Sequence, residues 1–250
     1  MSVPAQKSSV MAAISGRQID LSDFCAQDVC LLDVAHALSL QCRAGGHFER
    51  FYSVAQHCLN CEAEARAQGL GARVRLACLL HDAGEAYLSD LIRPVKALLP
   101  DYARLEKRID QAVFTAFGLD GLTAEEWEQV HAIDDAMLYY EFLALRQDVV
   151  LFDKAPEVCR LPDTDEQPSA LVRQSFAQLC ERLLRQAGVA ADKIDRVTRG
   201  KGCVSALSGL SGEETGLTAM QGEDGAGRLR VPECKEEIWD ENAHYRTFWH

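Results

Sequence analysis

Apolar residues recur at helical spacing along most of the first 187 residues of the chain. From Asp28 to about Cys42 they repeat every three or four positions, and Gly45 and Gly46 follow. The same spacing predicts further helices over residues 53–68, 72–86, 102–117, 124–147 and 168–187. Ser53 suits the N-cap of the second helix, because its hydroxyl can accept a bond from a free backbone N–H group.

The helix predicted over residues 72–86 is apolar on nearly every side, and such a helix belongs in the middle of a bundle. Before the first helix, residues 12–24 suggest a short extended or turn segment. No alternating strand pattern of comparable length competes with the helices. The sequence therefore predicts an all-α fold, built as a helical bundle.

The composition changes after Gly188. Eight glycines, with Ser and Thr between them, lie from residue 200 to residue 227, and this composition does not favour a helix. We therefore predict a main domain over residues 1–188 and a Gly/Ser-rich C-terminal appendage, of unassigned role, over residues 189–250. Apolar residues near its end are candidates for docking on the main domain or on a partner chain: Ile238, Trp239, Tyr245, Phe248 and Trp249.

Charge and hydropathy narrow the class of partner. The chain has 26 Lys and Arg against 38 Asp and Glu, a formal charge of −12, which repels a phosphate backbone and argues against long nucleic acid as a partner. It has no apolar run of about 18 residues and no apolar signal core near its start, so we expect a cytoplasmic protein that does not enter a membrane. A small anionic substrate remains compatible, because a bound dication can reverse the field inside a pocket.

The ten cysteines are expected to be free thiols, because they are scattered through helical patterns in a chain without an export signal. Cys58 and Cys61 form a C-x-x-C pair. A tetrahedral thiolate zinc site usually needs a second such pair, and the sequence has none. We interpret these two residues as part of the core.

The strongest chemical signal is His81-Asp82 followed by Glu85 within the most apolar helix. At about 100° per residue, these three side chains fall on the side of the helix opposite Leu79. Burying an imidazole beside two carboxylates is costly unless the groups are paired or coordinate a cation. The pattern therefore predicts part of a metal site.

Two further helices offer the remaining ligands. His57 lies at the edge of the apolar stripe of the second helix and is expected to face inward. Asp134 lies within the buried stripe of the helix over residues 124–147, whereas Asp135 points about 100° further round, so Asp134 is the better ligand. Glu141 shares that stripe and could reach the site or pair with a basic group near it.

A His, a His-Asp dipeptide and a distant Asp, each on its own helix, resemble the HD superfamily of metal-dependent phosphohydrolases. The similarity covers roughly residues 20–187 and extends to the branch that contains bacterial 5′-deoxynucleotidases and related deoxynucleotide triphosphohydrolases. The matching segments are residues 35–39 (AHALS), Arg43, residues 46–47 (GH), residues 52–57 (YSVAQH), residues 81–87 (HDAGEAY), Asp90, Pro94 and Lys96.

This resemblance implies an HD-domain bundle with one divalent ion, Mn, Fe, Co or Zn, bound by four ligands: His57, His81, Asp82 and Asp134. It implies proton transfer to or from the attacking water for Glu85, and positioning of substrate or water for Asp90. It also implies phosphate binding by Arg43, with Lys96 as a helper, and a homodimer. His47, in a loop, could reach phosphate or solvent, and His36 is expected to be structural.

The chain departs from the family pattern at two places. Relatives often have Gly before the Asp of the segment that follows the His-Asp helix, and Pro two residues after that Asp. Here these positions hold Ser89 and Ile92, so the loop over the substrate is expected to differ. Arg43 is followed by Ala44, where some nucleotidases have Trp, which leaves base or sugar packing open.

The leading hypothesis from the sequence is an enzyme that hydrolyses a deoxynucleoside 5′-monophosphate to nucleoside and phosphate. A deoxynucleoside triphosphate triphosphohydrolase is the rival within catalysis, because both reactions need the same metal. A rival of another class is a non-catalytic nucleotide sensor that keeps the metal for structure, and a plain helical scaffold is the last alternative. A helper carboxylate at position 85 favours catalysis, because a structural ion does not need one.

Overall fold

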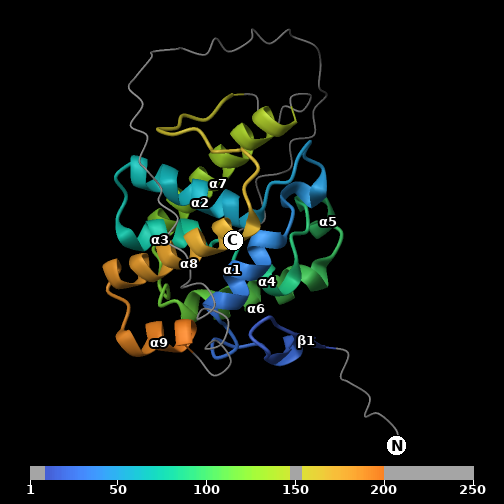
Figure 1. Ribbon diagram of the computed structural model, residues 1–250, viewed down its shortest axis with the longest axis vertical. Coiled ribbons are helices and arrows are strands. Elements are labelled where there is room, and N and C mark those ends of the chain that lie inside the picture. Colours follow the sequence, from blue (N-terminus) through green and yellow to red (C-terminus); the bar gives the residue numbers. More distant parts are fainter. Residues whose placement is uncertain (1–8, 147–153, 200–250) are drawn as a thin grey trace, which may run out of the picture. The chain divides into compact units, whose positions relative to one another are not determined.

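The computed structural model describes residues 9–146 and 154–199, and this part of the chain is mostly helical (Figure 1), which confirms the all-α expectation. A short antiparallel hairpin of β1 (Val10–Ala12) and β2 (Gln18–Asp20) precedes the helices, within or beside the segment predicted as extended or turn. Two 3₁₀ turns are η1 (Leu21–Asp23) and η2 (Arg43–Gly46). The α-helices are α1 (Leu31–Leu40), α2 (Val54–Ala67), α3 (Ala72–Leu80), α4 (Glu85–Leu88), α5 (Arg93–Lys96), α6 (Pro100–Ala116), α7 (Ala124–Leu145), α8 (Ser169–Gln186) and α9 (Ala191–Arg199).

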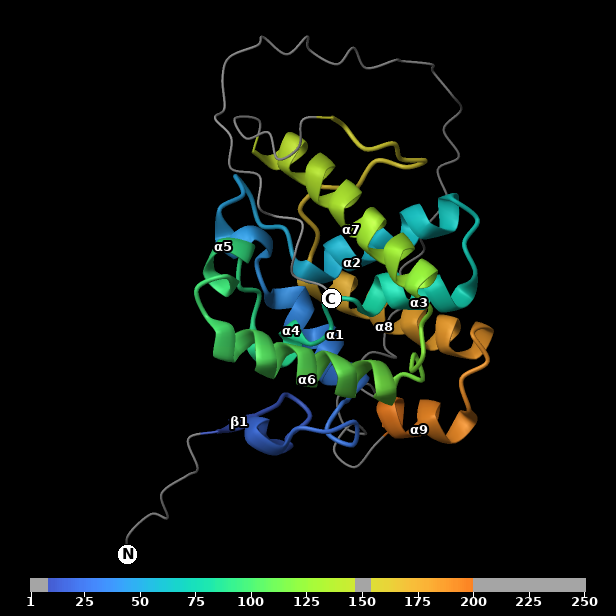
Figure 2. The same ribbon diagram turned by 180° about the vertical axis from the view of Figure 1, so that it is seen from behind.

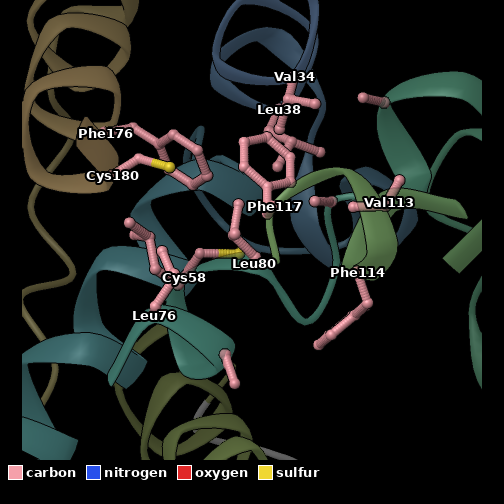
Figure 3. Packing of buried hydrophobic residues seen from close by; sticks show 14 of the residues in the cluster. Val34, Leu38, Cys58, Leu76, Leu80, Val113, Phe114, Phe117, Phe176 and Cys180 are labelled. Carbon is pink, nitrogen blue, oxygen red and sulfur yellow. The ribbon is translucent and has the colours of Figure 1, made fainter. Parts of the chain in front are cut away.

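Helix α3 lies in the middle of the bundle, as its apolar sequence predicted. It packs against α2, α7 and α8, and Figure 2 shows α7 crossing on the side away from α8. Leu76 and Leu80 of α3 are fully buried in the same apolar core as Leu38 of α1, Phe176 of α8 and Phe117, which caps α6 (Figure 3). Burying apolar side chains of this size stabilises the fold by about 1.5–3 kcal/mol each, so the core holds α3 firmly in place.

A capping box fixes the start of α2. The Ser53 hydroxyl accepts from the backbone N–H of Gln56 at 3.2 Å, and the Gln56 side chain accepts from the backbone N–H of Ser53 at 3.2 Å. The predicted N-cap is therefore confirmed. Because the helix starts at this residue, His57 falls on the first turn of α2, where it faces the bundle interior with no exposed surface.

The prediction of one continuous helix over residues 72–86 is wrong. Helix α3 ends at Leu80, residues 81–84 form a tight turn, and α4 starts at Glu85. Backbone bonds here span three residues instead of four: Ala83 donates to Leu80 at 2.9 Å and Glu85 to Asp82 at 3.0 Å. A turn of this kind advances about 120° per residue, so the directions of His81, Asp82 and Glu85 differ from those of an α-helix.

Gly84 permits the close approach of α6 to this turn. A Cβ atom at Gly84 would lie 2.0 Å from Oδ1 of Asp110 in α6. No side chain fits in that space unless the Asp110 carboxyl moves. The glycine therefore lets the turn of residues 81–84, called the His-Asp turn below, pack against α6.

Helix α9 lies beyond the predicted domain boundary at Gly188. It packs on α8 and α1, and Val197 is fully buried, so the helical unit continues past that boundary. The glycine-rich residues 200–250, with the apolar positions near the end of the chain, lie outside the described residues. Among the helices of residues 9–146 and 154–199, none combines the length and apolarity needed to cross a bilayer.

Candidate metal centre

Four side chains from separate elements come together in the interior. His57 comes from α2, His81 and Asp82 from the turn before α4, and Asp134 from α7. The Nε2 atom of His57 lies 3.0 Å from Oδ1 of Asp134 and 3.8 Å from Oδ2 of Asp82. The Nε2 atom of His81 lies 3.3 Å from Oδ2 of Asp82 and 3.6 Å from Oδ1 of Asp134. The structure thus brings together the four residues that the sequence singled out.

Both imidazoles are held from behind through Nδ1. The Nδ1 atom of His57 is 2.8 Å from Oε1 of Glu141, and the Nδ1 atom of His81 is 2.8 Å from the backbone carbonyl of Cys78. A carboxylate or carbonyl oxygen only accepts, so each Nδ1 donates, and each ring in its neutral form would direct the lone pair of Nε2 into the cluster. Those two Nε2 atoms lie 3.1 Å apart. Two lone pairs at this distance repel unless a proton or another cation lies between them. Metal-binding histidines also donate a hydrogen bond from the nitrogen that does not bind the metal.

The guanidinium of Arg43 lies among the same four residues. Its Nη1 atom donates to Oδ2 of Asp82 at 2.9 Å, and its Nη2 atom lies 3.0 Å from Nε2 of His57 and 3.3 Å from Oδ1 of Asp134. Its Nε atom is buried and has no hydrogen-bond partner, with Oε2 of Glu141 3.9 Å away. Arg43 is thus a cation embedded in the candidate ligand set, a position that the resemblance did not indicate.

The charges of the cluster shift the ionisation of its members. Burial raises the pKa of Asp82, but His81 and Arg43 outweigh it and the pKa lies below its usual range. Burial acts on Asp134 in the same way, and hydrogen bonds from His57 and His81 hold its pKa well below that range. Both carboxylates are therefore ionised and able to bind a cation. The pKa of His81 is well above its ordinary value because Asp82 and Asp134 outweigh the effect of burial.

Glu85 lies beside the cluster in α4, 6% exposed. Its Oε1 atom is 3.5 Å from Nζ of Lys96, and its Oε2 atom is buried without a hydrogen-bond partner. Burial raises the pKa of Glu85 well above its usual value, and the carboxylates of Asp82 and Asp90 raise it further. A raised pKa makes the ionised carboxylate a stronger base than an exposed glutamate, and so better able to take up a proton.

Lys96 is held by two glutamates. Its Nζ atom is 2.6 Å from Oε1 of Glu106 in α6, closer than its contact with Glu85 at 3.5 Å. Sequence reasoning missed Glu106, because nothing in its helical pattern distinguishes it from a solvent-facing charge. The structure therefore supports Lys96 as a partner of Glu85 more directly than as a phosphate ligand.

Buried polar atoms without partners gather around this centre. Five such atoms in the described residues belong to side chains already in or next to the cluster, and the sixth is Nε of Arg196. Buried polar groups are nearly always satisfied, so this concentration fits a site that takes up a further polar group or ion. The five atoms are Gln41 Oε1, Arg43 Nε, Glu85 Oε2, Asp90 Oδ2 and Glu141 Oε2. Gln41, which sequence reasoning also missed, donates from Nε2 to the backbone carbonyl of Glu85 at 2.9 Å.

Two cysteines border the centre. Two groups in the described residues have ligand atoms that all lie within 4.8 Å of one another and could hold a metal: His57 with Cys61 and His81, and Cys58 with His81 and Asp82. Cys58 and Cys61 are both buried among apolar side chains, as the sequence predicted. Sulfur therefore lines one side of the cluster, with the Cys61 Sγ atom 3.5 Å from His57 Nε2.

The phase of α7 separates the two neighbouring aspartates as predicted. The side chain of Asp134 is 18% exposed and faces the cluster, whereas that of Asp135 is 48% exposed. Arg93 of α5 bridges them from outside, with Nη2 3.3 Å from Oδ2 of Asp134 and 3.0 Å from Oδ1 of Asp135. Its own side chain is 60% exposed. Arg93 is a cation at the rim of the site that sequence reasoning did not single out.

The other candidate residues lie further from the cluster. His47 follows η2 and is exposed, and its backbone carbonyl accepts from Nη1 of Arg146 at 2.9 Å. The Nδ1 atom of His36 is 3.2 Å from Nη1 of Arg173 in α8, which agrees with a structural role. A hollow of about 310 Å³ opens beside Arg43, between η2 and Tyr52. This hollow gives the rim of the site room for a small molecule.

Comparison with known proteins gives relatives without an assigned activity. The chain is 38% identical over 111 residues to the uncharacterized protein YfdR of Escherichia coli, a match that covers 44% of this chain and 60% of that protein. It is 45% identical over 111 residues to the uncharacterized protein RCAP_rcc00048 of Rhodobacter capsulatus, covering 42% of this chain and 57% of that protein. The chain therefore spans about 60% of the length of these curated relatives. No protein-family model matches it.

Proposed function

We propose that this protein is a divalent-metal-dependent phosphohydrolase of the HD kind, which converts a deoxynucleoside 5′-monophosphate to nucleoside and phosphate. The observation that carries the proposal is the pair of imidazole Nε2 atoms 3.1 Å apart, each fixed from behind through Nδ1 and each within 4 Å of two carboxylates. The choice of a nucleotide as substrate comes from the sequence resemblance.

His57, His81, Asp82 and Asp134 would hold the ion. Two imidazole nitrogens with two carboxylates suit Mn²⁺, Fe²⁺, Co²⁺ or Zn²⁺. A bound ion of this kind supplies positive charge to the phosphoryl oxygens and lowers the pKa of water. The buried polar atoms without partners around the ligands support the fit of such a group.

Glu85 would hold and pass the proton. Lys96 is near Oε1 and leaves Oε2 without a donor, so Oε2 is the oxygen that can accept a proton from water. The raised pKa of this carboxyl group makes its ionised form a stronger base, which suits that proton transfer. Asp90 has a second buried, partnerless oxygen, Oδ2, and would orient the water or the substrate.

Arg43 would bind the phosphate. The guanidinium presents two donors in one plane, which match two oxygens of a phosphate. Both cations already have partners, because Arg43 contacts Asp82 and Asp134, and Lys96 contacts Glu85 and Glu106. Either one would have to exchange a contact to bind phosphate. His47 is exposed beyond η2, and a contact with phosphate would require the loop to change.

A hydrolysis screen tests the proposal. The purified protein, supplied with Mn²⁺, Co²⁺ or Zn²⁺, is incubated with deoxynucleoside mono-, di- and triphosphates, and the released product is identified. Inorganic phosphate released from monophosphates alone is the expected result, with the double variant His81→Ala, Asp82→Ala as the blank. Release of triphosphate would replace the proposed substrate with a deoxynucleoside triphosphate. A metal-loaded protein that hydrolyses none of the panel would refute the catalytic proposal.

Glu85→Gln tests the proton role separately from metal binding. Because Glu85 is not among the four ligands, this variant should bind the ion with little change and lose at least about 100-fold in kcat, in line with general acid–base catalysis. Metal content by elemental analysis is the matched readout. If Glu85→Gln keeps wild-type activity, the assignment of Glu85 is wrong even though the metal centre stands.

A further inference from the structure

The guanidinium of Arg43 contacts the very atoms that would bind a metal ion. It reaches Oδ2 of Asp82 at 2.9 Å, Nε2 of His57 at 3.0 Å and Oδ1 of Asp134 at 3.3 Å. These contacts come from two nitrogens of one planar group, so the guanidinium lies between ligands supplied by α2, the His-Asp turn and α7.

An ion and the guanidinium cannot hold these positions together. A transition-metal ion binds imidazole nitrogen and carboxylate oxygen at about 2.0–2.2 Å, along their lone pairs. With Nδ1 donating to Glu141, the Nε2 atom of a neutral His57 has one lone pair, which cannot bind an ion and also accept from Nη2 of Arg43, 3.0 Å away. Any ion that takes this nitrogen as a ligand must therefore first displace the guanidinium.

We propose that Arg43 is an internal counter-cation of the ligand cluster, and that a divalent ion binds by displacing it. This inference rests on the proposed metal centre and concerns its affinity. Buried carboxylates without a partner are strongly unfavourable, and Arg43 compensates Asp82 and Asp134 in the geometry described here. The metal affinity then depends on the difference between two free energies: that of the ligands with the bound ion and that of the same ligands with the guanidinium.

The surroundings of Arg43 provide the means for displacement. Arg43 begins η2, in which Ala44, Gly45 and Gly46 all have left-handed backbone angles, with φ of 56°, 61° and 78°. A hollow of about 310 Å³ is lined in part by Arg43, so the side chain has space to turn away from the cluster. A displaced guanidinium would recover two free donors at the edge of the centre, where an anionic group of the substrate would bind.

The test is metal affinity in four proteins that differ by one arginine: the wild type, Arg43→Ala, Arg43→Lys and Arg93→Ala. Each protein is stripped with a chelator and titrated with Co²⁺ at the same pH, about 8, because metal binding releases protons from the ligands and so depends on pH. Visible absorption of bound Co²⁺ and competition with a chromophoric chelator give the Kd. Arg93→Ala is the matched control, because Arg93 also contacts Asp134, at 3.3 Å, but from the rim and with 60% of its side chain exposed.

Arg43→Ala is expected to bind Co²⁺ roughly 10- to 100-fold more tightly than the wild type, because the ion no longer displaces charge-assisted hydrogen bonds. Arg93→Ala should tighten binding by less than about threefold, the small effect of an exposed charge. Arg43→Lys keeps the charge but offers a single ammonium that cannot reproduce the planar two-nitrogen contact, so an intermediate gain is expected. It also serves as the folded variant if Arg43→Ala does not fold.

Three results would overturn the inference. Unchanged or weaker Co²⁺ binding in both Arg43 variants would show that the guanidinium does not compete with the ion. Equal gains in Arg43→Ala and Arg93→Ala would mean that the charge acts through space, without displacement. Absence of Co²⁺ binding in all four proteins would refute the metal centre itself, a failure distinct from the first two because the wild type also fails.

Discussion

Glu141→Gln removes the negative charge next to the His57 imidazole and keeps the shape of the side chain at position 141. Glu141 is fully buried in α7, and its Oε1 atom accepts from Nδ1 of His57 at 2.8 Å and from the hydroxyl of Tyr52 at 2.7 Å. The Oε1 atom of glutamine can accept both bonds, while its amide nitrogen replaces Oε2, the oxygen without a hydrogen-bond partner. The substitution therefore removes the negative charge behind His57 and keeps the packing.

The size of the effect follows from this arrangement. A carboxylate that accepts from the outer nitrogen of a metal-binding histidine fixes its tautomer and makes the ligand more basic, and losing it typically weakens metal binding 10- to 100-fold. That range equals about 1.4–2.7 kcal/mol. We expect Glu141→Gln to raise the Kd for Co²⁺ by this factor, measured by chelator competition, while circular dichroism shows an unchanged helical fold.

Glu64→Gln is the matched control. Glu64 is also a fully buried glutamate, on α2, and it accepts from the backbone N–H groups of Cys159 at 2.8 Å and Arg160 at 2.7 Å. Its replacement should lower the free energy of unfolding by about 1–3 kcal/mol, because an amide group then faces a backbone donor. Its Co²⁺ affinity should stay at the wild-type value. A Glu141→Gln protein with wild-type affinity, or equal loss in both variants, would refute the role given to the Glu141 carboxylate.

Other measurements probe the surroundings of the centre. Ser89 has φ 69° and ψ 155°, a region that strains side-chain-bearing residues, so Ser89→Gly should raise the free energy of unfolding by about 1 kcal/mol and the Tm by about 2–4 °C in a thermal melt. Burial, Glu106 and Asp82 raise the pKa of Asp110 from 3.8 to about 7, so its ionisation costs stability as pH rises from about 4 to 7, with an upper bound of roughly 4 kcal/mol. Asp110→Asn should therefore stabilise the protein at about pH 8 relative to wild type and give little gain near pH 4, and a gain independent of pH in denaturant titrations would contradict this. Added Co²⁺ should raise the Tm of the wild type in proportion to the logarithm of its concentration but leave the His81→Ala, Asp82→Ala protein unchanged.

Helices with their own start signals and a strong apolar stripe could be predicted from the sequence. Ser53 and Gln56 form a capping box that depends only on neighbouring residues, so the start of α2 was readable locally. Helix α9 was missed because its segment was grouped with the glycine-rich residues that follow it, although Ile194 and Val197 lie three residues apart on one face of an otherwise polar helix. Val197 is fully buried where this face packs on α8 and α1.

The His-Asp turn shows where a helical wheel fails. An α-helical winding placed His81, Asp82 and Glu85 on one side, but the backbone tightens to three-residue bonds between Leu80 and Tyr87. The Asp110 carboxyl of α6 occupies the space next to Gly84 in this turn. A contact between residues 26 positions apart leaves no trace in local spacing. The four candidate ligands lie together, although the continuous helix from which two of them were predicted does not form.

The position of Arg43 among the candidate ligands could not be predicted from helical phase or from motif similarity. Phase placed Asp134 and Glu141 on the same side of α7, two turns apart, and motif similarity assigned Arg43 to phosphate. Neither argument gives the crossing of α2, η2 and α7 that sets the guanidinium 3.0 Å from His57 Nε2. Because buried anions need compensation at all times, a site that gains and loses an ion is more stable if a side chain can take the place of that ion. The same arginine would then neutralise the ligands before the metal binds and the substrate phosphate afterwards, so occupancy of the centre would control whether its phosphate-binding group is available.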